Sequence, residues 1–482
     1  MATLRLDRLS RAQEAALRAV LAAAPRRSRP VLVGGAVRDA WLARAPRFGQ
    51  ADLDLAVAAG ALELARKVAG RLDGAFVPLD AERGTARVVA SGVRIDVADW
   101  RAPTLEADLA ARDYTVNALA VPVRELLRDG AAPVVDPTGG LADLRARRLR
   151  PPDPRVLAED PLRGLRGARL EAALGLRLTP GAAAAIRRTA PTLAGVAPER
   201  VRDEILLVLA LPTAARALRR MDALGLLPAV VPEVEPMRRT AQPAPHRFAV
   251  LEHSLRAVGG ADLVLARTVE LVPLGEALAR HTDEALGGGV TRGQVLKLAA
   301  LLHDVAKPET RRVIGGRVRF FEHDVVGAAR ARAIGERLRL PARAIDVLER
   351  LVRHHLRPMH LAAAGPVTHR ARYRFYRDLA EDAQDLLLLA LVDAAAVTGA
   401  SPLRVWRRAD LLRELLAGFP EVHAVRAAPP LLRGQDVMTR LGLPAGPAIG
   451  RMLARLREAQ DLGRLRTRED ALAYLDSLAG EP

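Results

Sequence analysis

The sequence contains no cysteine. Disulfides, thiolate zinc sites, iron–sulfur clusters and cysteine nucleophiles are therefore excluded, and any metal ion must be held by histidine and carboxylate side chains. Aromatic residues make up only 3% of the chain, whereas 50% of it is hydrophobic. The core must therefore consist mainly of alanine, leucine and valine, and the high helix propensity of alanine and leucine favours helices over sheets.

The chain also lacks the apolar runs that mark signal peptides and membrane spans. Its N-terminal stretch, MATLRLDRLSRAQEAALRAV, alternates charged with apolar residues. No run of about 18 uncharged apolar residues occurs anywhere in the sequence. These absences predict a cytoplasmic protein that does not enter a membrane.

Lysine is nearly absent. It occurs only at positions 67, 297 and 307, so arginine supplies almost all of the basic charge behind the formal net charge of +18. Such a charge suits a polyanionic partner such as a nucleic acid. Because coding from a GC-rich genome also enriches arginine, the charge supports this interpretation without establishing it.

The 482 residues are enough for about three domains. Residues 1–150 are predicted to form an α/β head, because strand-like segments alternate with helical ones: VLVGG (31–35), DLDLAV (52–57), ARVVA (86–90) and VRIDVADW (93–100). From residue 155 onward the pattern is almost entirely helical, and PPDP at 151–154 predicts a hinge. The expected fold is therefore a mixed sheet with helices, followed by all-α parts.

Histidine is distributed unevenly. Nine of the ten histidines lie between residues 246 and 369, about a quarter of the chain. This clustering predicts a separate domain at 240–400 with chemistry of its own. It leaves a helical neck at 151–239 and a helical tail at 401–482.

In the predicted head, LVGGAVRDAWL places two glycines where a strand meets a helix. Gly34 and Gly35 would let the backbone approach a triphosphate, with helix N–H groups aimed at it, and Arg38 would add a cation. Farther along, Asp52 and Asp54 share one face of a strand. Two neighbouring carboxylates repel each other unless divalent cations bind them, and two such ions form the clamp of nucleotidyl transfer.

Asp96, on the predicted strand 93–100, is the candidate third carboxylate, although an ordinary exposed strand residue fits this position nearly as well. A further cluster, EDPLRGLR (159–166), opens a predicted helix. An N-cap with an ordinary Asp–Arg pair would explain it. Alternatively, Asp160 would accept from the amino group of cytosine or adenine while Arg163 donates to the adjacent ring nitrogen. That pattern rejects guanine and uracil, and fits selection of CTP and ATP without a nucleic-acid template.

Five segments follow one another in an order that resembles the motifs of the class II tRNA nucleotidyltransferase and bacterial poly(A) polymerase family. They are LVGGAVRD with ADLDLAV, LEADLAARDYTVNALA (105–120), VVDPTGGLADLRARRLR (134–150), EDPLRGLRGARLEAALGLRL (159–178) and APERVRDEILLVL (197–209). The resemblance covers about residues 30–235. It implies a nucleotidyltransferase head that uses Mg²⁺ to add C and A nucleotides from CTP and ATP to the 3′ end of tRNA.

The resemblance also implies roles for individual residues. Asp52 and Asp54 would bind the metal ions. Three residues would hold the ribose and the triphosphate: Arg112, Asp113 and Asn117. Nucleotide selection and binding would fall to Glu159, Asp160, Arg163 and Arg166.

Two departures from the family pattern stand out. The second motif reads Ala111-Arg112-Asp113-Tyr114 where the family usually has Arg-Arg-Asp-Phe, so one basic contact is missing. The segment between Trp100 and Leu109 is very short, whereas CCA-adding members often carry a longer flexible loop there. A short loop is similar to that of enzymes that add only C, so C-only addition is an alternative to complete CCA addition.

The histidine-rich part has the order H…HD…H…H…D, which resembles the HD superfamily of metal-dependent phosphohydrolases. The matching residues are His253, His303, Asp304, His323, His354 and Asp393. Such a ligand set without sulfur suits Mn²⁺, Co²⁺, Ni²⁺ or Mg²⁺. His355, His360 and His369 fit no position of this pattern and are expected on the surface.

Other interpretations stay open at this point. The histidine-rich part argues against a poly(A) polymerase, and the intact Asp52, Asp54 and EDPLR argue against an HD hydrolase whose head merely binds tRNA. The HD part itself could be a degenerate module kept for its shape. The tail segment LLRGQDVMTRLGLPAGPAIGRMLARLREA resembles the C-terminal region of the same family and would contact tRNA phosphates through arginine.

Overall fold

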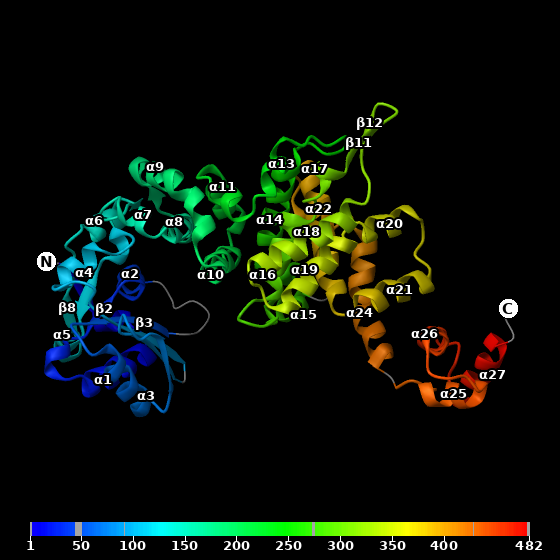
Figure 1. Ribbon diagram of the computed structural model, residues 1–482, viewed down its shortest axis with the longest axis horizontal. Helices are drawn as coiled ribbons and strands as arrows, with labels where there is room; N and C mark the ends of the chain where they lie inside the picture. Colours follow the sequence, from blue (N-terminus) through cyan, green and yellow to red (C-terminus); the bar gives the residue numbers. More distant parts are fainter. Residues whose placement is uncertain (1, 44–50, 91, 272–274, 428, 480–482) are drawn as a thin grey trace. The chain divides into compact units, whose positions relative to one another are not determined.

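The computed structural model describes residues 2–43, 51–90, 92–271, 275–427 and 429–479. The chain divides into two compact units, Met1–Glu204 with Arg220–Val230, and Ile205–Arg219 with Val231–Pro482. Figure 1 follows the chain through both units. Among the described residues, no helix combines the length and the apolar composition needed to cross a bilayer.

The N-terminal unit contains a mixed six-stranded sheet with the strand order β4-β5-β6-β3-β2-β7. Its strands are β2 (Val31–Val33), β3 (Ala51–Val57), β4 (Ala75–Asp80), β5 (Thr85–Ala90), β6 (Val93–Asp99) and β7 (Ala120–Pro122). Strands β3 and β6 run parallel, and the other neighbouring pairs run antiparallel. The four predicted strands correspond to β2, β3, β5 and β6. Strand β4 escaped prediction because it is an exposed edge strand that contains Pro78.

Alternation along the strands separates a core face of the sheet from a polar face. The core face carries buried apolar side chains: Leu53, Leu55, Ile95 and Val97. Helices α1 (Arg11–Ala23) and α3 (Ala61–Arg71) contact these strands. Burying each such side chain contributes about 1.5–3 kcal/mol, which fixes the register because a one-residue shift would expose all of them. Asp54 and Asp96 lie at the intervening positions and so share the opposite, polar face.

Helices follow the sheet within the same unit, among them α8 (Leu162–Leu174); of α10 (Pro198–Leu209), the residues up to Glu204 belong to this unit. On either side of the PPDP stretch, β9 (Arg148–Leu149) pairs in parallel with β10 (Arg177–Leu178). The backbone N–H of Thr115 donates to the carbonyl of Arg150 at 3.0 Å. The polypeptide after residue 154 is thus bonded to the polypeptide before residue 151.

The C-terminal unit is helical apart from one hairpin in its described residues. Its central helices are α14 (Val250–Ala266), α16 (Arg292–Leu302), α18 (His323–Arg337), α19 (Ala342–His354) and α22 (Asp382–Thr398). They pack against one another. The hairpin of β11 (Arg311–Ile314) and β12 (Arg317–Phe320) projects from these helices (Figure 1).

Three further helices of this unit, α25 (Gly434–Leu441), α26 (Pro447–Asp461) and α27 (Arg468–Ala479), enclose a small apolar core of their own. The predicted fold class, an α/β head followed by helical parts, is confirmed. The sequence analysis did not predict the β11–β12 hairpin.

Candidate active sites

The first candidate site lies on the polar face of the head sheet. Asp54 of β3 is directly beside Asp96 of the parallel strand β6. Arg87 of β5 donates two hydrogen bonds to the Asp96 carboxylate, at 2.7 and 2.9 Å. The predicted third carboxylate is thus part of an ion pair. The side chain of Asp52, two residues before Asp54, lies outside the described residues.

Of the two predicted glycines, Gly34 follows β2 and Gly35 begins α2 (Gly35–Trp41), and both lie close to the Asp54 carboxylate. Gly34 has a φ of +68°, in the left-handed region that favours glycine. A Cβ added to Gly34 would lie 3.5 Å from Asp54 Oδ2 and 3.3 Å from Arg112 Nη1. A Cβ on Gly35 would lie 3.8 Å from the same carboxylate oxygen. The turn therefore presents bare backbone between an acidic and a basic side chain, as a phosphate-binding turn requires.

A chain of hydrogen bonds connects this turn to helix α8. Arg38 Nη1 donates to Asn117 Oδ1, and Asn117 Nδ2 donates to Asp113 Oδ1 at 3.2 Å. Arg166 Nη1 donates to the other oxygen of Asp113 at 3.0 Å and Arg166 Nε donates to Glu204 at 3.1 Å. The structure thus brings together several of the residues predicted to bind the nucleotide.

Asp113 is buried at the centre of this chain, with 8% of its surface exposed. Burial alone would raise the pKa of its carboxyl group, but Arg166 and the donors Asn117 and Tyr114 N outweigh burial and lower that pKa. Asp113 is therefore a buried anion. It orients Asn117 and Arg166, and this burial favours positioning over direct contact with a ribose.

Tyr114 explains one departure from the family pattern. Its hydroxyl donates to the carbonyl of Arg163 at 2.8 Å, a bond that the usual phenylalanine could not make. Helix α8 has a glycine opposite the ring, since a Cβ on Gly167 would lie 2.0 Å from the tyrosine hydroxyl oxygen. The second motif and helix α8 are thus fitted to each other.

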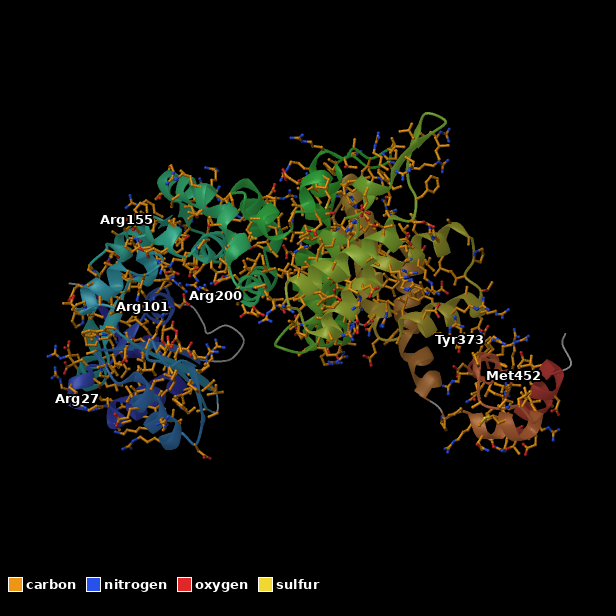
Figure 2. The ribbon with its side chains drawn as sticks, viewed as in Figure 1. Arg27, Arg101, Arg155, Arg200, Tyr373 and Met452 are labelled. Carbon is orange, nitrogen blue, oxygen red and sulfur yellow. The ribbon has the colours of Figure 1, made fainter. Side chains whose placement is uncertain are left out.

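The predicted base-selecting residues lie at the start of α8 with protein partners of their own. Asp160 Oδ2 accepts from Arg200 Nη2 at 2.6 Å, and Arg163 Nη1 donates to the Val156 carbonyl at 3.1 Å. The Glu159 carboxylate, 3.8 Å from Arg163, is largely exposed. A base that binds Asp160 and Arg163 must replace these contacts. The sequence analysis missed Arg200 of α10, labelled in Figure 2, although it lies within the APERV segment of the fifth motif.

The second candidate site is a cluster of six side chains in the C-terminal unit, which we call the HD cluster. It consists of His253 on α14, His303 and Asp304 after α16, His323 on α18, His355 after α19 and Asp393 on α22. His253 Nε2 lies 2.9 Å from Asp393 Oδ1 and 3.2 Å from His303 Nε2. The side chains form two possible metal-binding groups, His253–His303–Asp304 and Asp304–His323–His355, which share Asp304.

The HD cluster is buried and has unsatisfied polar atoms. His323 Nε2 and His355 Nε2 face Asp304 at 3.5 and 3.7 Å, but neither has a hydrogen-bond partner among the described residues. A buried polar atom without a partner costs about 1–3 kcal/mol, and a cation would remove this cost. The imidazole and carboxylate donors therefore fit two divalent ions that share Asp304.

The protonation states of the cluster suit cation binding. Burial, together with the neighbouring His303, lowers the pKa of His355 to about 4, which leaves a neutral imidazole with a lone pair. Burial would also lower the pKa of His303, but Asp304 and Asp393 raise it to about 10. These two carboxylates thus favour positive charge at this point, carried by a proton or by a metal ion.

The structure corrects one predicted ligand. His354, the last residue of α19, does not join the cluster, and the prediction that His355 lies on the surface is wrong because only 2% of it is exposed. Successive helical residues differ by about 100° in direction, so adjacent histidines cannot face the same point. His355 continues the buried stripe of Leu348, Leu351 and Val352. The helical spacing of these apolar residues could have identified His355, instead of His354, as the buried histidine. The predicted exposure of His360 and His369 is confirmed.

Lys307 is a further residue that the sequence analysis missed. Its Nζ lies 2.7 Å from Asp304 Oδ2 and donates to Gln242 Oε1 at 2.7 Å. It is one of only three lysines and follows the His-Asp pair by three residues. Its charge balances that of Asp304 inside the unit.

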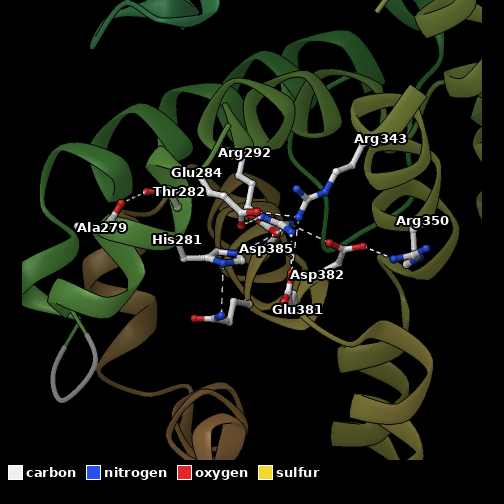
Figure 3. A network of polar contacts seen from close by, with 11 residues as sticks. Ala279, His281, Thr282, Glu284, Arg292, Arg343, Arg350, Glu381, Asp382 and Asp385 are labelled. Carbon is white, nitrogen blue, oxygen red and sulfur yellow. Dashed lines mark hydrogen bonds and ion pairs between the residues drawn. The ribbon is translucent and has the colours of Figure 1, made fainter. Parts of the chain in front are cut away.

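A buried arginine ties together the helices that carry the cluster (Figure 3). Arg292, at the start of α16, has a side chain only 1% exposed. Its Nη1 lies 2.7 Å from carboxylate oxygens of both Asp382 and Asp385 on α22, and its Nε donates to Glu284. Arg350 of α19 also pairs with Asp382. Helices α16, α19 and α22, which place four of the cluster residues, are therefore cross-linked at this network.

Comparison with known proteins gives matches over most of the chain. The profile of the poly A polymerase head domain matches residues 31–150, that of the probable RNA and SrmB-binding site of polymerase A matches 175–238, and that of the HD domain matches 264–396. An A-adding tRNA nucleotidyltransferase of Deinococcus radiodurans is 39% identical, over 93% of this chain and 95% of its own length. A CC-adding tRNA nucleotidyltransferase of Thermus thermophilus is 36% identical, over 92% of both chains.

Solved structures share the fold. A CCA-adding enzyme in complex with ATP aligns with a TM-score of 0.63 at 18% identity, over 99% of this chain and all of the other. A Thermotoga maritima CCA-adding enzyme in complex with tRNA aligns with a TM-score of 0.58 at 18% identity, over the same shares.

Proposed function

Since this chain belongs to the tRNA nucleotidyltransferase family, we propose that it transfers nucleotides from CTP and ATP to the 3′ end of tRNA without a nucleic-acid template. The observation that carries this proposal is the convergence of Asp54, Arg112 and the Gly34–Gly35 turn at one point of the polar sheet face. The proposal assigns residues 1–150 to the head, 151–239 to the neck, 240–400 to the HD domain and 401–482 to a tRNA-contacting tail.

In this proposal the polar face supplies the groups that bind and orient the triphosphate. Asp52 and Asp54 would hold two Mg²⁺ ions, which activate the attacking hydroxyl and stabilise charge on the phosphates. The backbone at Gly34 and Gly35 would bind the phosphates, and Arg38 and Arg112 are the nearby cations. Asp113 would keep Asn117 and Arg166 in place.

Base selection would be the task of Asp160 and Arg163. Arg200 must release Asp160, and Arg163 must release the Val156 carbonyl, before both can face a base edge. A hydrogen bond to a base edge contributes to the binding free energy only the amount by which it exceeds the bond that it replaces. Binding is therefore modest in strength, whereas a base with the wrong edge leaves Asp160 and Arg163 without partners and is rejected. Glu159 stands beside them as an exposed carboxylate.

The test is incorporation of each labelled nucleotide into tRNA that lacks its 3′ CCA, followed by sequencing of the product. We expect C and A but neither G nor U in the product. A long run of A would instead identify a poly(A) polymerase. Absence of any incorporation, with tRNA binding intact, would identify a head that only binds.

A second candidate function is addition of the C nucleotides alone. The link from β6 to α4 (Leu105–Ala110) consists of residues 100–104, and Arg101 N donates to Asp108 Oδ1 at 3.0 Å across it. A link so short and bonded gives little room for a loop that reshapes the pocket from C to A. The relative that is 36% identical is named for CC addition, which favours this candidate, whereas the one that is 39% identical is named for A addition, which makes addition of A alone the third candidate.

Three substrates separate these outcomes: tRNA ending before CCA, tRNA-C and tRNA-CC, each with CTP alone and with ATP alone. Addition of C to the first two substrates with CTP, together with addition of A to tRNA-CC with ATP, is the expected result and would identify the complete enzyme. Reaction of tRNA-CC alone, with ATP, would identify A addition. Addition of C without any reaction of tRNA-CC with ATP would identify C-only addition.

For the HD cluster we propose metal-dependent hydrolysis of phosphate esters. Its support is the buried set of donors with unsatisfied nitrogen atoms around Asp304. Hydrolysis of phosphomonoesters and 2′,3′-cyclic phosphates is measured with Mn²⁺, Co²⁺, Ni²⁺ and Mg²⁺. Asp304→Ala should abolish it while nucleotide addition persists. Inactivity of the wild type with all four ions would identify a domain kept for its shape.

A further inference from the structure

The β11–β12 hairpin carries arginines on its exposed face. Gly315 and Gly316 form the two-residue turn, both with positive φ. The antiparallel register pairs Arg312 with Arg319 and Ile314 with Arg317, so these four side chains lie on one face. All four are exposed, whereas the other face combines the exposed Arg311 and Val313 with the partly buried Val318 and Phe320.

The positive charge on this face lacks a counter-ion among the described residues. Arg312 and Arg319 are directly opposite each other, which destabilises a two-stranded hairpin that is marginal to begin with. Within the described part of the chain, none of Arg312, Arg317 and Arg319 forms an ion pair with a carboxylate. Elsewhere exposed arginines commonly do, as Arg330 does with Glu309 at 2.9 Å. The hairpin charge is thus available to an anion from outside.

Both strands of the hairpin are connected to the HD cluster where they leave the helices. Strand β12 ends at Phe320, whose carbonyl lies 2.9 Å from His323 Nδ1. Strand β11 follows the short helix of Lys307, whose Nζ lies 5.5 Å from the Phe320 ring centroid and 2.7 Å from Asp304. Each strand extends for about 14 Å, at about 3.4 Å per residue. The arginines therefore start beside the cluster and reach outward from it.

We propose that this hairpin is an RNA-binding arm, in which Arg312, Arg317 and Arg319 bind successive phosphates of a single-stranded RNA end and guide its terminal phosphate ester to the HD cluster. Its role in hydrolysis rests on the proposed phosphohydrolase function; RNA binding by the arm does not. Guanidinium groups form paired hydrogen bonds with phosphate oxygens, and RNA offers such groups at regular intervals. An RNA end also carries the kind of bond that the cluster would hydrolyse.

The first experiment measures binding of a labelled single-stranded RNA to the full chain at several salt concentrations. The test variant is Arg312→Gln/Arg317→Gln/Arg319→Gln. The matched control, Arg18→Gln/Lys67→Gln/Arg71→Gln, removes the same charge from α1 and α3, which cover the core face of the head sheet. A second variant with lysine at positions 312, 317 and 319 keeps the charge.

We expect the salt slope of the glutamine hairpin variant to fall by about 2, because each phosphate contact to a single strand contributes about 0.7, and its affinity near 0.1 M salt to fall by about tenfold or more. The control and the lysine variant should keep the wild-type slope. Equal slopes for wild type and the glutamine hairpin variant, with the hairpin variant folded, would overturn the proposal. Reduced solubility as its only change would assign the arginines to protection of a strand edge.

The second experiment compares the hydrolysis of RNA ending in a 2′,3′-cyclic phosphate with that of bis(p-nitrophenyl) phosphate by the metal-loaded protein. The glutamine hairpin variant should lose about tenfold in kcat/KM on RNA, in keeping with its weaker binding, and nothing on the small ester. If the wild type hydrolyses neither substrate, the phosphohydrolase proposal fails while the binding experiment still decides on the arm. If the wild type but not the glutamine hairpin variant sediments with phosphatidylglycerol vesicles, while both bind RNA equally, the proposal is overturned and the partner of the hairpin is a membrane surface.

Discussion

The polar sheet face of the head and the HD cluster solve opposite electrostatic problems. On the head, carboxylates are neutralised by arginines, as Asp96 is by Arg87 and Asp113 by Arg166. In the HD cluster, imidazole nitrogens and carboxylates face one another inside the unit, and His323 Nε2 and His355 Nε2 have no partner among the described residues. The head, with its arginine hydrogen-bond donors, suits a polyanion as its ligand. The HD cluster, whose histidine nitrogens carry lone pairs without a partner, suits cations. We therefore expect that a substitution in one site leaves the activity of the other site unchanged.

The largest expected effect tests the head. Asp54→Asn removes a charge that would hold the catalytic metal ions, so nucleotide addition should fall by about a thousandfold or more, since such ions supply several kcal/mol and each 1.4 kcal/mol is tenfold. The matched variant Asp96→Asn changes a carboxylate already paired with Arg87 and should cost less. Steady-state kinetics on tRNA and on a phosphate ester provide the measurement. A loss of ester hydrolysis in Asp54→Asn would contradict the independence of the two sites.

The head could be predicted well because its geometry is local. A strand repeats every two residues, so the spacing of Asp52 and Asp54 in DLDLAV predicts a shared face, and the stretch does form strand β3. What lay beyond the sequence pattern were partners distant along the chain: Arg200, forty residues from Asp160, and Arg87 opposite Asp96. Whether a carboxylate has a cation beside it depends on packing between helices and on strand pairing, which spacing alone does not fix.

The HD cluster was harder to predict because five helices contribute to it. The order of histidines and aspartates indicated the set, but the direction of each side chain depends on helix phase. The sequence analysis assigned His354 to the order and left its neighbour His355 out, and only the buried stripe of α19 shows that His355 is the residue that faces the cluster. The hairpin was not predicted because each of its strands has only four residues, and because β11, which reads RRVI, lacks the alternation of apolar and polar residues that marks a half-buried strand.

The next prediction concerns the ion-pair network of Arg292 with Asp382 and Asp385. Arg292→Met leaves Asp382 and Asp385 buried without their main cation, so the free energy of unfolding of the C-terminal unit should fall by about 3–5 kcal/mol. Arg343→Met, which breaks an ion pair at a half-exposed side chain, should cost less than about 1 kcal/mol. Trp406 reports on this unit alone in a Trp41→Phe/Trp100→Phe background. Equal effects of the two variants would mean that Arg292 does not hold the helices.

A smaller effect separates the two adjacent histidines. His355→Gln should weaken Mn²⁺ binding by more than about tenfold, since metal sites lose 10–100-fold even when a residue behind a ligand is changed. His354→Gln should leave the affinity unchanged, because His354 lies outside the cluster. Titration of the metal-free protein by calorimetry measures both. The reverse order of effects would restore His354 as the ligand.

The smallest effect concerns acid and the buried anion of the head. The folded state lowers the pKa of Asp113, so its charge stabilises the fold above the unfolded pKa of about 3.9, and this contribution is lost as the pH falls through the lower folded value. Asp113→Asn removes the charge while Arg166 keeps Glu204, so we expect about 1–3 kcal/mol less stability at pH 6.

Below about pH 4 the gap between wild type and Asp113→Asn should narrow, because Asp113 becomes protonated first in the unfolded wild-type chain and then, at its lower pKa, in the folded one. Urea unfolding followed by fluorescence in a Trp406→Phe background reports on the head unit, which contains Trp41 and Trp100. Asp129→Asn is the control, since it breaks an exposed pair with Arg128 and should leave no measurable gap at any pH. If the difference in free energy of unfolding stayed constant from pH 6 to pH 3, the charge of Asp113 would not stabilise the head. Glu204 would then be the residue that holds Arg166 in position.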